Sequence, residues 1–86
     1  MLLEILTPEE KVYSGEVYGV QLPGVEGLFE VLDRHAAMVS ALGKGTIKIL
    51  RSVRNDVDKN FSVSGGFVEV LNNKATVLVE GATELS

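Results

Sequence analysis

Short apolar runs separated by turn residues are the feature that most limits what this chain can fold into. Valine and isoleucine are frequent inside the runs, and no long stretch repeats its apolar residues at the helical period of 3.6. The runs expected to form strands are Leu2–Leu6, Val12–Leu22, Leu28–Leu32, Met38–Leu42, Thr46–Val53, Asn60–Ser64, Phe67–Leu71 and Ala75–Glu80. Strands that recur about every 8–12 residues predict an all-β fold, either a β-sandwich or a small barrel.

Size and composition exclude several classes of protein. A chain of 86 residues has room for one domain with one thin core. It contains no cysteine and one histidine, so thiolate metal sites, disulfides and cysteine nucleophiles are excluded. The net charge of −4 argues against a nucleic-acid partner. The sequence shows neither a signal peptide nor an apolar run of about 18 residues, so no direct membrane insertion is expected.

Glycine and asparagine pairs mark the sharp changes of direction. Asn72-Asn73 lies between two apolar runs and predicts a tight hairpin turn, because asparagine tolerates a positive φ. The buried phase of the alternation slips by one residue across Gly65-Gly66, and again around Gly19. A bulge or sharp bend at these glycines would explain both slips and would suit a sheet that folds over onto a second sheet.

Two segments are less clear from the residues alone. The stretch from Asp33 to Gly43 fits a strand or a short helix equally well, with Asp33 as N-cap and Gly43 just beyond the last turn. The C-terminal end has no clear pattern. We therefore expect one domain over residues 1–82 and a loose tail over residues 83–86.

The search for catalytic chemistry finds no site. Glu26 and Glu30 could in principle act as an acid and base pair, but the favoured interpretation is that both are surface charges. Gly65-Gly66 lacks the following Lys-Ser/Thr of a phosphate-binding loop, and His35 has no evident triad partners. The chain is thus expected to be no enzyme and to hold no metal, nucleotide or other cofactor. A small hydrolase using His35 with Glu26 or Glu30 is the weakest of the readings left open.

Apolar residues at positions where a lone sandwich would prefer polar ones are the remaining signal. They are Leu28-Phe29, the run Ala36-Ala37-Met38-Val39, Tyr13 and Tyr18. Such residues either close the ends of the core or form a contact surface for another protein. A free-standing small β-sandwich binding module is one protein of this kind.

Several motifs together resemble one known family. They are Thr7-Pro8-Glu9-Glu10-Lys11-Val12-Tyr13-Ser14-Gly15-Glu16-Val17, Leu22-Pro23-Gly24-Val25-Glu26-Gly27, His35-Ala36 with Val39-Ser40-Ala41-Leu42, and Val63-Ser64-Gly65-Gly66-Phe67-Val68-Glu69-Val70. In this order and at this spacing, they resemble the N-terminal domain of the ATP synthase epsilon chain, which is called delta in mitochondria. The resemblance extends from about Leu3 to Glu80.

The resemblance implies a fold and a set of partners. It implies a flattened β-sandwich of about ten strands, with Met38–Leu42 as a strand. It also implies a non-catalytic rotor subunit in the central stalk of F-type ATP synthase, which couples proton translocation to ATP synthesis. The partners would be the gamma subunit, the membrane c-ring and the alpha/beta catalytic head. The place would be the cytoplasmic side of the bacterial plasma membrane, as a peripheral subunit.

The family's contact positions carry over onto particular residues here. The gamma-facing positions match Thr7, His35 and Ser40, with Met38 as their neighbour. The c-ring-facing positions match Val25, Glu26, Gly27, Leu28 and Glu30.

The sequence departs from the family in three places. Glu30 stands where the family usually has glycine, and Ala37 stands where it usually has proline. No helix-forming stretch follows Gly81, whereas most members continue into a helical hairpin that inhibits ATP hydrolysis. The expectation is therefore a naturally short subunit with no C-terminal helical domain.

Overall fold

Ten strands make up the regular structure in the computed structural model, which describes residues 1–52 and 56–85. The strands are β1 (Leu2–Leu6), β2 (Lys11–Glu16), β3 (Gly19–Gly24), β4 (Gly27–Leu32), β5 (Met38–Leu42), β6 (Gly45–Leu50), β7 (Val57–Val63), β8 (Gly66–Leu71), β9 (Lys74–Val79) and β10 (Ala82–Leu85). No helix occurs within the described ranges. The prediction of an all-β fold of about ten strands is confirmed.

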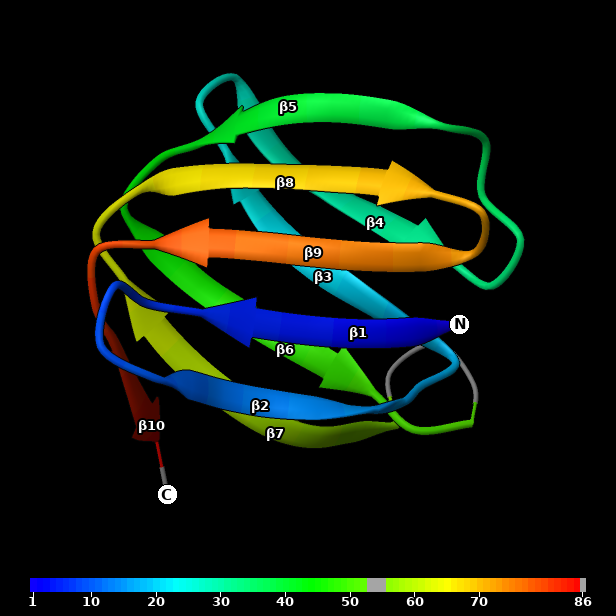
Figure 1. Cartoon of the computed structure of the whole chain (residues 1–86), viewed down its shortest axis with the longest axis horizontal. Helices are drawn as coiled ribbons and strands as arrows, with labels where there is room; N and C mark the ends of the chain where they lie inside the picture. Colours follow the sequence, from blue (N-terminus) through cyan, green and yellow to red (C-terminus); the bar gives the residue numbers. More distant parts are fainter. Residues whose placement is uncertain (53–55, 86) are drawn as a thin grey trace.

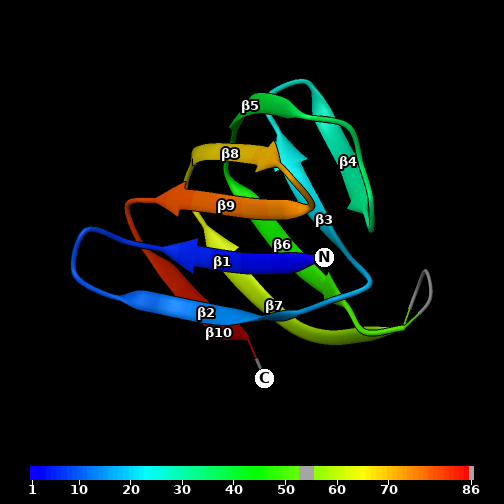
Figure 2. The ribbon, with the colours of Figure 1, turned by 45° about the vertical axis from the view of Figure 1, so that its right-hand side comes forward.

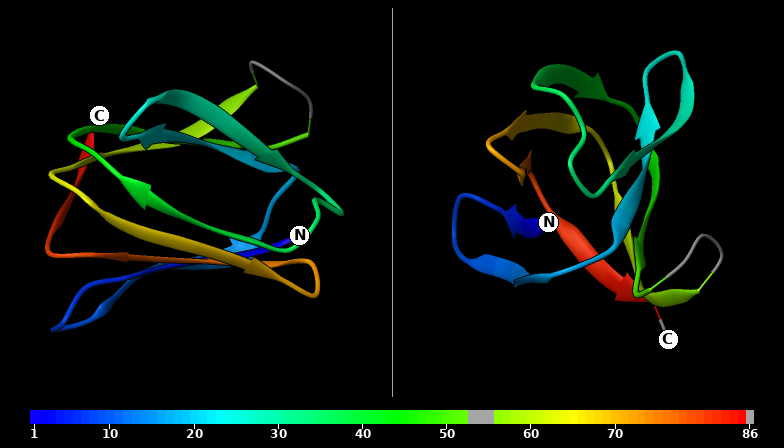
Figure 3. Two further views of the ribbon diagram at one scale, coloured as in Figure 1. Left: turned by 90° about the horizontal axis from the view of Figure 1, so that it is seen from above. Right: turned by 90° about the vertical axis from the view of Figure 1, so that its right-hand side faces the viewer.

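The strands form one continuous sheet that folds over into two layers (Figures 1 and 3). Layer 1 is β2-β1-β9-β8-β5, and layer 2 is β4-β3-β6-β7-β10. A single register pair, Gly24 with Leu42, joins β3 of layer 2 to β5 of layer 1. The neighbours are antiparallel except β1 and β9, which run parallel. The result is a ten-stranded sandwich that closes almost into a barrel, with principal extents of 27, 26 and 25 Å.

The core lies between the two layers and follows from the alternation of each strand. On β8 and β9, for example, inward positions are apolar and buried, and most of the intervening positions face solvent. The largest fully buried side chains are Phe61, Leu3, Ile5, Leu22, Ile47, Ile49, Val20, Val31, Val68, Val70 and Val77. Where β2 faces β7, the ring of Tyr13 meets that of Phe61 edge to face, with centroids 6.3 Å apart.

Gly65-Gly66 carries the chain from layer 2 into layer 1, between β7 and β8. Both glycines have a positive φ, +139° and +150°, which L side chains rarely adopt. A Cβ on Gly66 would also collide with the carbonyl oxygen of Leu78 on β9. The predicted phase slip is therefore a sharp bend between two layers.

The second slip also lies between layers, but the strand expected over Val12–Leu22 is wrong. The chain leaves β2 at Glu16 and enters β3 at Gly19, so this stretch forms two strands in two layers. At the break, two backbone N–H groups pair with distant parts of the chain: Val17 N–H donates to Met1 O at 2.8 Å and Tyr18 N–H to Leu50 O at 3.1 Å.

The predicted Asn72-Asn73 hairpin joins β8 to β9, with φ values of 51° and 59°. Asn73 also ties this turn to the β4–β5 connection. Its Oδ1 accepts from Arg34 N–H at 2.7 Å, and its Nδ2 donates to Asp33 Oδ1 at 3.1 Å. The Met1 ammonium donates to the same oxygen at 2.6 Å. This contact, with Asn73, holds the pKa of the Asp33 carboxyl below its ordinary value.

The two ambiguous segments are both strands. Met38–Leu42 is β5, as the resemblance implied, and the helical alternative over 33–43 does not form. The expected loose tail over 83–86 is wrong for residues 83–85. They belong to β10, because the edge of β7 offers unpaired backbone groups that β10 satisfies from Ala82 to Leu85. Strand β6 ends at Leu50, and the expected strand end at Val53 and Ser86 of the tail lie outside the described residues.

Candidate protein interface

An apolar row crosses the outer face of layer 1. Ala41 on β5, Phe67 on β8, Leu78 on β9 and Leu6 on β1 are successive register partners, so their side chains lie side by side across four strands. Phe67 is 58% and Leu78 51% exposed. Two further exposed side chains, Val39 and Leu71, extend the apolar surface away from the row. We call these six residues the apolar face.

The next row along the same strands is polar except for Val39 at its β5 end, and one of its charges is neutralised within the chain. Its members in register are Val39, Glu69, Thr76, Glu4 and Ser14. Lys11 Nζ lies 3.0 Å from Glu4 Oε2, and Lys74 Nζ lies 3.1 Å from Glu4 Oε1. The hydrogen bonds from Lys11 and Lys74 lower the pKa of the Glu4 carboxyl from its ordinary value of 4.5.

The centre of the outer face of layer 2 is polar, although Leu28 on β4 and Leu85 on β10 are exposed at its edges. Across β4, β3, β6 and β7, the register partners on this outer face are Glu30, Gln21, Lys48 and Asn60. Residues Thr46 and Ser62 pair in the neighbouring row. A sandwich with both outer faces in water would be polar at the centre of both layers. The apolar face of layer 1 therefore indicates a surface that another protein covers.

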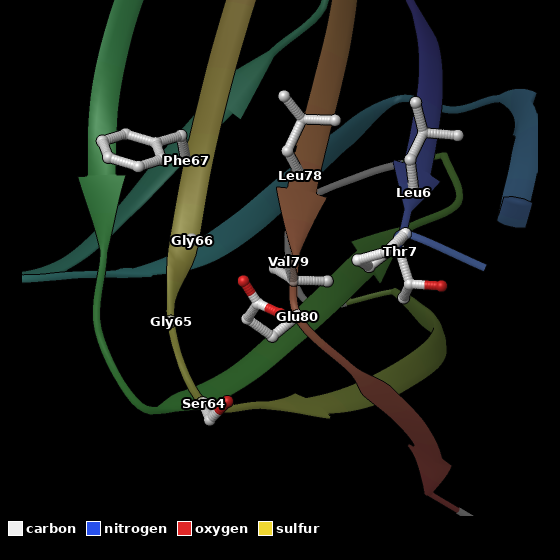
Figure 4. A pocket seen from close by; sticks show the side chains of 10 residues that line it. Leu6, Thr7, Ser64, Gly65, Gly66, Phe67, Leu78, Val79 and Glu80 are labelled. Atoms are coloured by element: carbon white, nitrogen blue, oxygen red, sulfur yellow. The ribbon is translucent and has the colours of Figure 1, made fainter. Parts of the chain in front are cut away.

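An open pocket of about 530 Å³ adjoins the apolar face, where β1 and β9 end and Gly65-Gly66 bends (Figure 4). Figure 4 shows Phe67, Leu78 and Leu6 from three adjacent strands above it, with Thr7 and Glu80 at its margin. The Thr7 hydroxyl also closes the β1–β2 turn, since it contacts both the backbone N and O of Glu10 at 3.2 Å. This pocket continues the apolar face around the edge of layer 1.

The predicted gamma-facing residues do not form one cluster. Thr7 lies at the pocket just described, at the end of β1. His35 is exposed in the β4–β5 connection, where its Nδ1 lies 2.8 Å from Ala36 O. Figure 1 shows this connection at the end of layer 1 opposite the β1–β2 turn. Met38 and Ser40 on β5 share the phase of the buried Val70 and Val68, so they lie on the inner side of layer 1, and Met38 packs against the core.

The predicted c-ring-facing residues lie together on the β3–β4 hairpin. Val25 and Leu28 are more than 60% exposed at its tip, and Gly27 has a φ of +131°. The tip reaches beyond the edge of β5 (Figure 2), where Val25 N–H donates to Ala41 O at 3.4 Å. Ser40 lines a small pocket with Glu26 and its neighbours at this tip. Glu30 stands further along β4, opposite Gln21 of β3.

The sequence does not predict most of the apolar face. Val39 is the exception, since it belongs to the run Ala36-Ala37-Met38-Val39 named above as a possible contact surface. The signal for Phe67 is present in the sequence: it shares its alternation phase with Glu69, and Glu69 must face out. The other apolar residues that were singled out behave differently. Tyr13 and Phe29 pack against the core, whereas Leu28 is exposed at the hairpin tip.

Residues 1–52 and 56–85 contain no cluster of three His, Cys, Asp or Glu side chains that could hold a metal ion. Within the same ranges, no helix is long and apolar enough to cross a bilayer. Fold and surface together define a β-sandwich domain with one outer face suited to contact with another protein.

Comparison with known proteins gives this domain a family. The model of the ATP synthase delta/epsilon chain β-sandwich domain matches residues 1–85, and the chain belongs to this family. It is 46% identical over 82 residues to the epsilon chain of Maridesulfovibrio salexigens, covering 95% of this chain and 56% of that one. For Salinibacter ruber the identity is 40% over 86 residues, covering 93% and 58%. For Chlorobaculum tepidum it is 42% over 78 residues, covering 91% and 86%.

Two solved structures share the fold. A chain in the cryo-EM structure of the Euglena gracilis mitochondrial ATP synthase, OSCP/F1/c-ring, superposes with a TM-score of 0.84 at 20% identity, covering 95% of this chain and 51% of that one. A chain in the central stalk/c-ring structure from Tetrahymena thermophila gives 0.77 at 21% identity, covering 95% and 64%. The chain thus spans little more than half the length of several of the proteins it matches.

Proposed function

We propose that this chain is a rotor subunit of an F-type ATP synthase. It joins the gamma subunit to the c-ring and couples proton translocation to ATP synthesis. Membership of the delta/epsilon family supports this, and so does a fold shared with chains of two ATP synthase assemblies. The observation that carries the proposal is the apolar face of layer 1, where Val39, Phe67, Leu71 and Leu78 are each more than half exposed. A surface of this kind suits a permanent interface, which needs a dry apolar centre.

Each of the two exposed apolar sites is assigned to one partner. The gamma subunit covers the apolar face of layer 1 together with Thr7, while His35, Met38 and Ser40 contact it at the β5 side. The c-ring contacts the β3–β4 tip through Val25, Glu26, Gly27 and Leu28, with Glu30 beside them. In support, Val25 and Leu28 are the exposed apolar residues of that hairpin.

The task proposed for the chain is mechanical. A sandwich whose core interlocks between two hydrogen-bonded layers resists shear, so torque passes from one contact surface to the other. The chain supplies no catalytic residue; the chemistry belongs to the alpha/beta head of the complex. The bacterial relatives support a peripheral place on the cytoplasmic side of the plasma membrane.

Two measurements test this function. Size-exclusion chromatography of the full chain with the gamma subunit of the same organism should give a stable one-to-one complex. Vesicles reconstituted with the ATP synthase lacking this chain should hydrolyse ATP without building a proton gradient, and adding the chain should restore pumping. Separate elution, or full pumping without the chain, would overturn the proposal.

A further inference from the structure

Glu69 is a charged residue in the middle of the apolar face. Its register partner on β5 is Val39, which is 70% exposed, and its partner on β9 is Thr76. On its own strand, Phe67 and Leu71 share its outward phase two residues to either side. The carboxylate is therefore bordered by three exposed apolar side chains.

The charge of Glu69 is not neutralised by the part of the chain that the structure describes. Lys74 stands diagonally across from it on β9, but the Lys74 ammonium lies 3.1 Å from Glu4. Lys11, the other cation of this face, lies 3.0 Å from the same Glu4. Within residues 1–52 and 56–85, no ion pair joins Glu69 to a cation. Of the two carboxylates in this row, Glu4 is satisfied within the chain and Glu69 is not.

A partner that covers this face would change the hydration of the Glu69 carboxylate. A partner seated on Val39, Phe67 and Leu71 would strip water from the charge between them. Removing an ionised carboxylate from water is costly unless a hydrogen-bonded cation replaces the water. An apolar or acidic surface would therefore be rejected here, and a surface with one cation in register would be selected.

We propose that Glu69 is the residue that selects and aligns the gamma subunit, by accepting an ion pair from a lysine or arginine that gamma places over the apolar face. This rests on the proposed function, since gamma is the partner assigned to this face. The apolar side chains supply contact area, and the single buried ion pair fixes where along the strands the partner sits.

The test compares charge changes on the two layers. Glu69→Gln keeps the shape and removes the charge, and Glu69→Lys reverses it. Glu84→Gln makes the same change as the first on β10 of layer 2, where the carboxylate lies 3.4 Å from the half-exposed ammonium of Lys59. Titration calorimetry measures the affinity of each full chain for the isolated gamma subunit at low and high salt. Thermal melts check that the three variants fold as the unmodified chain does.

We expect Glu69→Gln to weaken binding by about ten-fold or more and Glu69→Lys by about a hundred-fold or more, as for other desolvated charge pairs. Glu84→Gln should stay within about two-fold of the unmodified chain. Equal affinities for the unmodified chain and Glu69→Gln would overturn the ion pair and leave the proposed function standing. Failure of the unmodified chain to bind gamma would overturn both.

Discussion

Phe67 on β8 and Leu78 on β9 are register partners on the outer face of layer 1, and more than half of each side chain is exposed. Their strand neighbours Val68 and Val77 are also register partners but lie in the core with no exposure. At this position the two strands are therefore apolar on both sides. Folding needs only the inner side to be apolar, and the proposed contact with a partner accounts for the outer side.

Serine at both Phe67 and Leu78 should separate binding from folding. Surface substitutions usually change the free energy of unfolding by about 0.5 kcal/mol or less each, so the double variant should stay folded. Its affinity for gamma should fall by about 30-fold or more, because residues at the centre of an interface are often worth at least about 2 kcal/mol. Calorimetric titration and urea unfolding measure the two effects. Leu85→Ser on β10 is the control and should bind normally.

Gly66→Ala should be markedly destabilising. The substitution forces alanine into a positive φ and drives its Cβ against the carbonyl oxygen of Leu78. We expect the free energy of unfolding to fall by about 2–4 kcal/mol. Gly27→Ala is the matched control, because Gly27 has a φ of +131° but nothing within 4 Å of the added Cβ. It should cost only about 1–2 kcal/mol, and equal losses would show that the contact with Leu78 is unimportant.

Asn73→Gly should loosen the tie between the β8–β9 turn and the β4–β5 connection. Glycine keeps the positive φ of the turn but loses the hydrogen bonds with Arg34 N–H and Asp33 Oδ1. Asn72→Gly makes the same backbone change at a φ of 51°. Asn73→Gly should therefore lower the free energy of unfolding by about 1 kcal/mol more than Asn72→Gly does. Equal urea midpoints for the two variants would contradict this.

Acid should destabilise the chain partly through Glu4. Lys11 and Lys74 lower the pKa of this carboxyl in the folded state. A group with a lowered folded pKa stabilises the fold above its unfolded pKa, and this stabilisation is lost as pH falls through the folded pKa. The urea midpoint of the unmodified chain should therefore drop as pH falls below the ordinary value of 4.5. Glu4→Gln should flatten that drop, whereas Glu9→Gln in the β1–β2 turn should leave it unchanged.

The sequence predicts most of the fold because its alternation is clean. In runs such as Val68-Glu69-Val70, the alternation of apolar and charged residues shows which side is buried. Asn72-Asn73 and Gly65-Gly66 tolerate the positive φ that their turns need. The strands it misses lack such a signal. β10 has no buried side chain along Ala82–Leu85 and exists because β7 has a free edge. The break between β2 and β3 is set by tertiary backbone bonds from Val17 and Tyr18.

The candidate interface is predicted less well than the fold. A single strand shows that Phe67 faces outward, but it does not show that Ala41, Leu78 and Leu6 lie beside it. That row exists only through the register of four strands, one of them the parallel pair of β1 with β9. The positions carried over from the family are likewise separated by the fold. Thr7 lies in the β1–β2 turn and His35 in the β4–β5 connection, and Figure 1 shows these two connections at opposite ends of layer 1. Pairing register is a long-range property, and residue spacing alone does not determine it.

The central claim is that the gamma subunit covers the apolar face of layer 1. The chain has no cysteine, so maleimide can modify only the one cysteine that is introduced, and its rate measures the exposure of that position. The most direct measurement is the rate at which a maleimide modifies Leu78→Cys and, separately, Lys48→Cys on the outer face of layer 2, free and in complex with gamma. We predict that gamma protects Leu78→Cys by about ten-fold or more and leaves Lys48→Cys as reactive as in the free chain. Protection of Lys48→Cys with no protection of Leu78→Cys would contradict the claim.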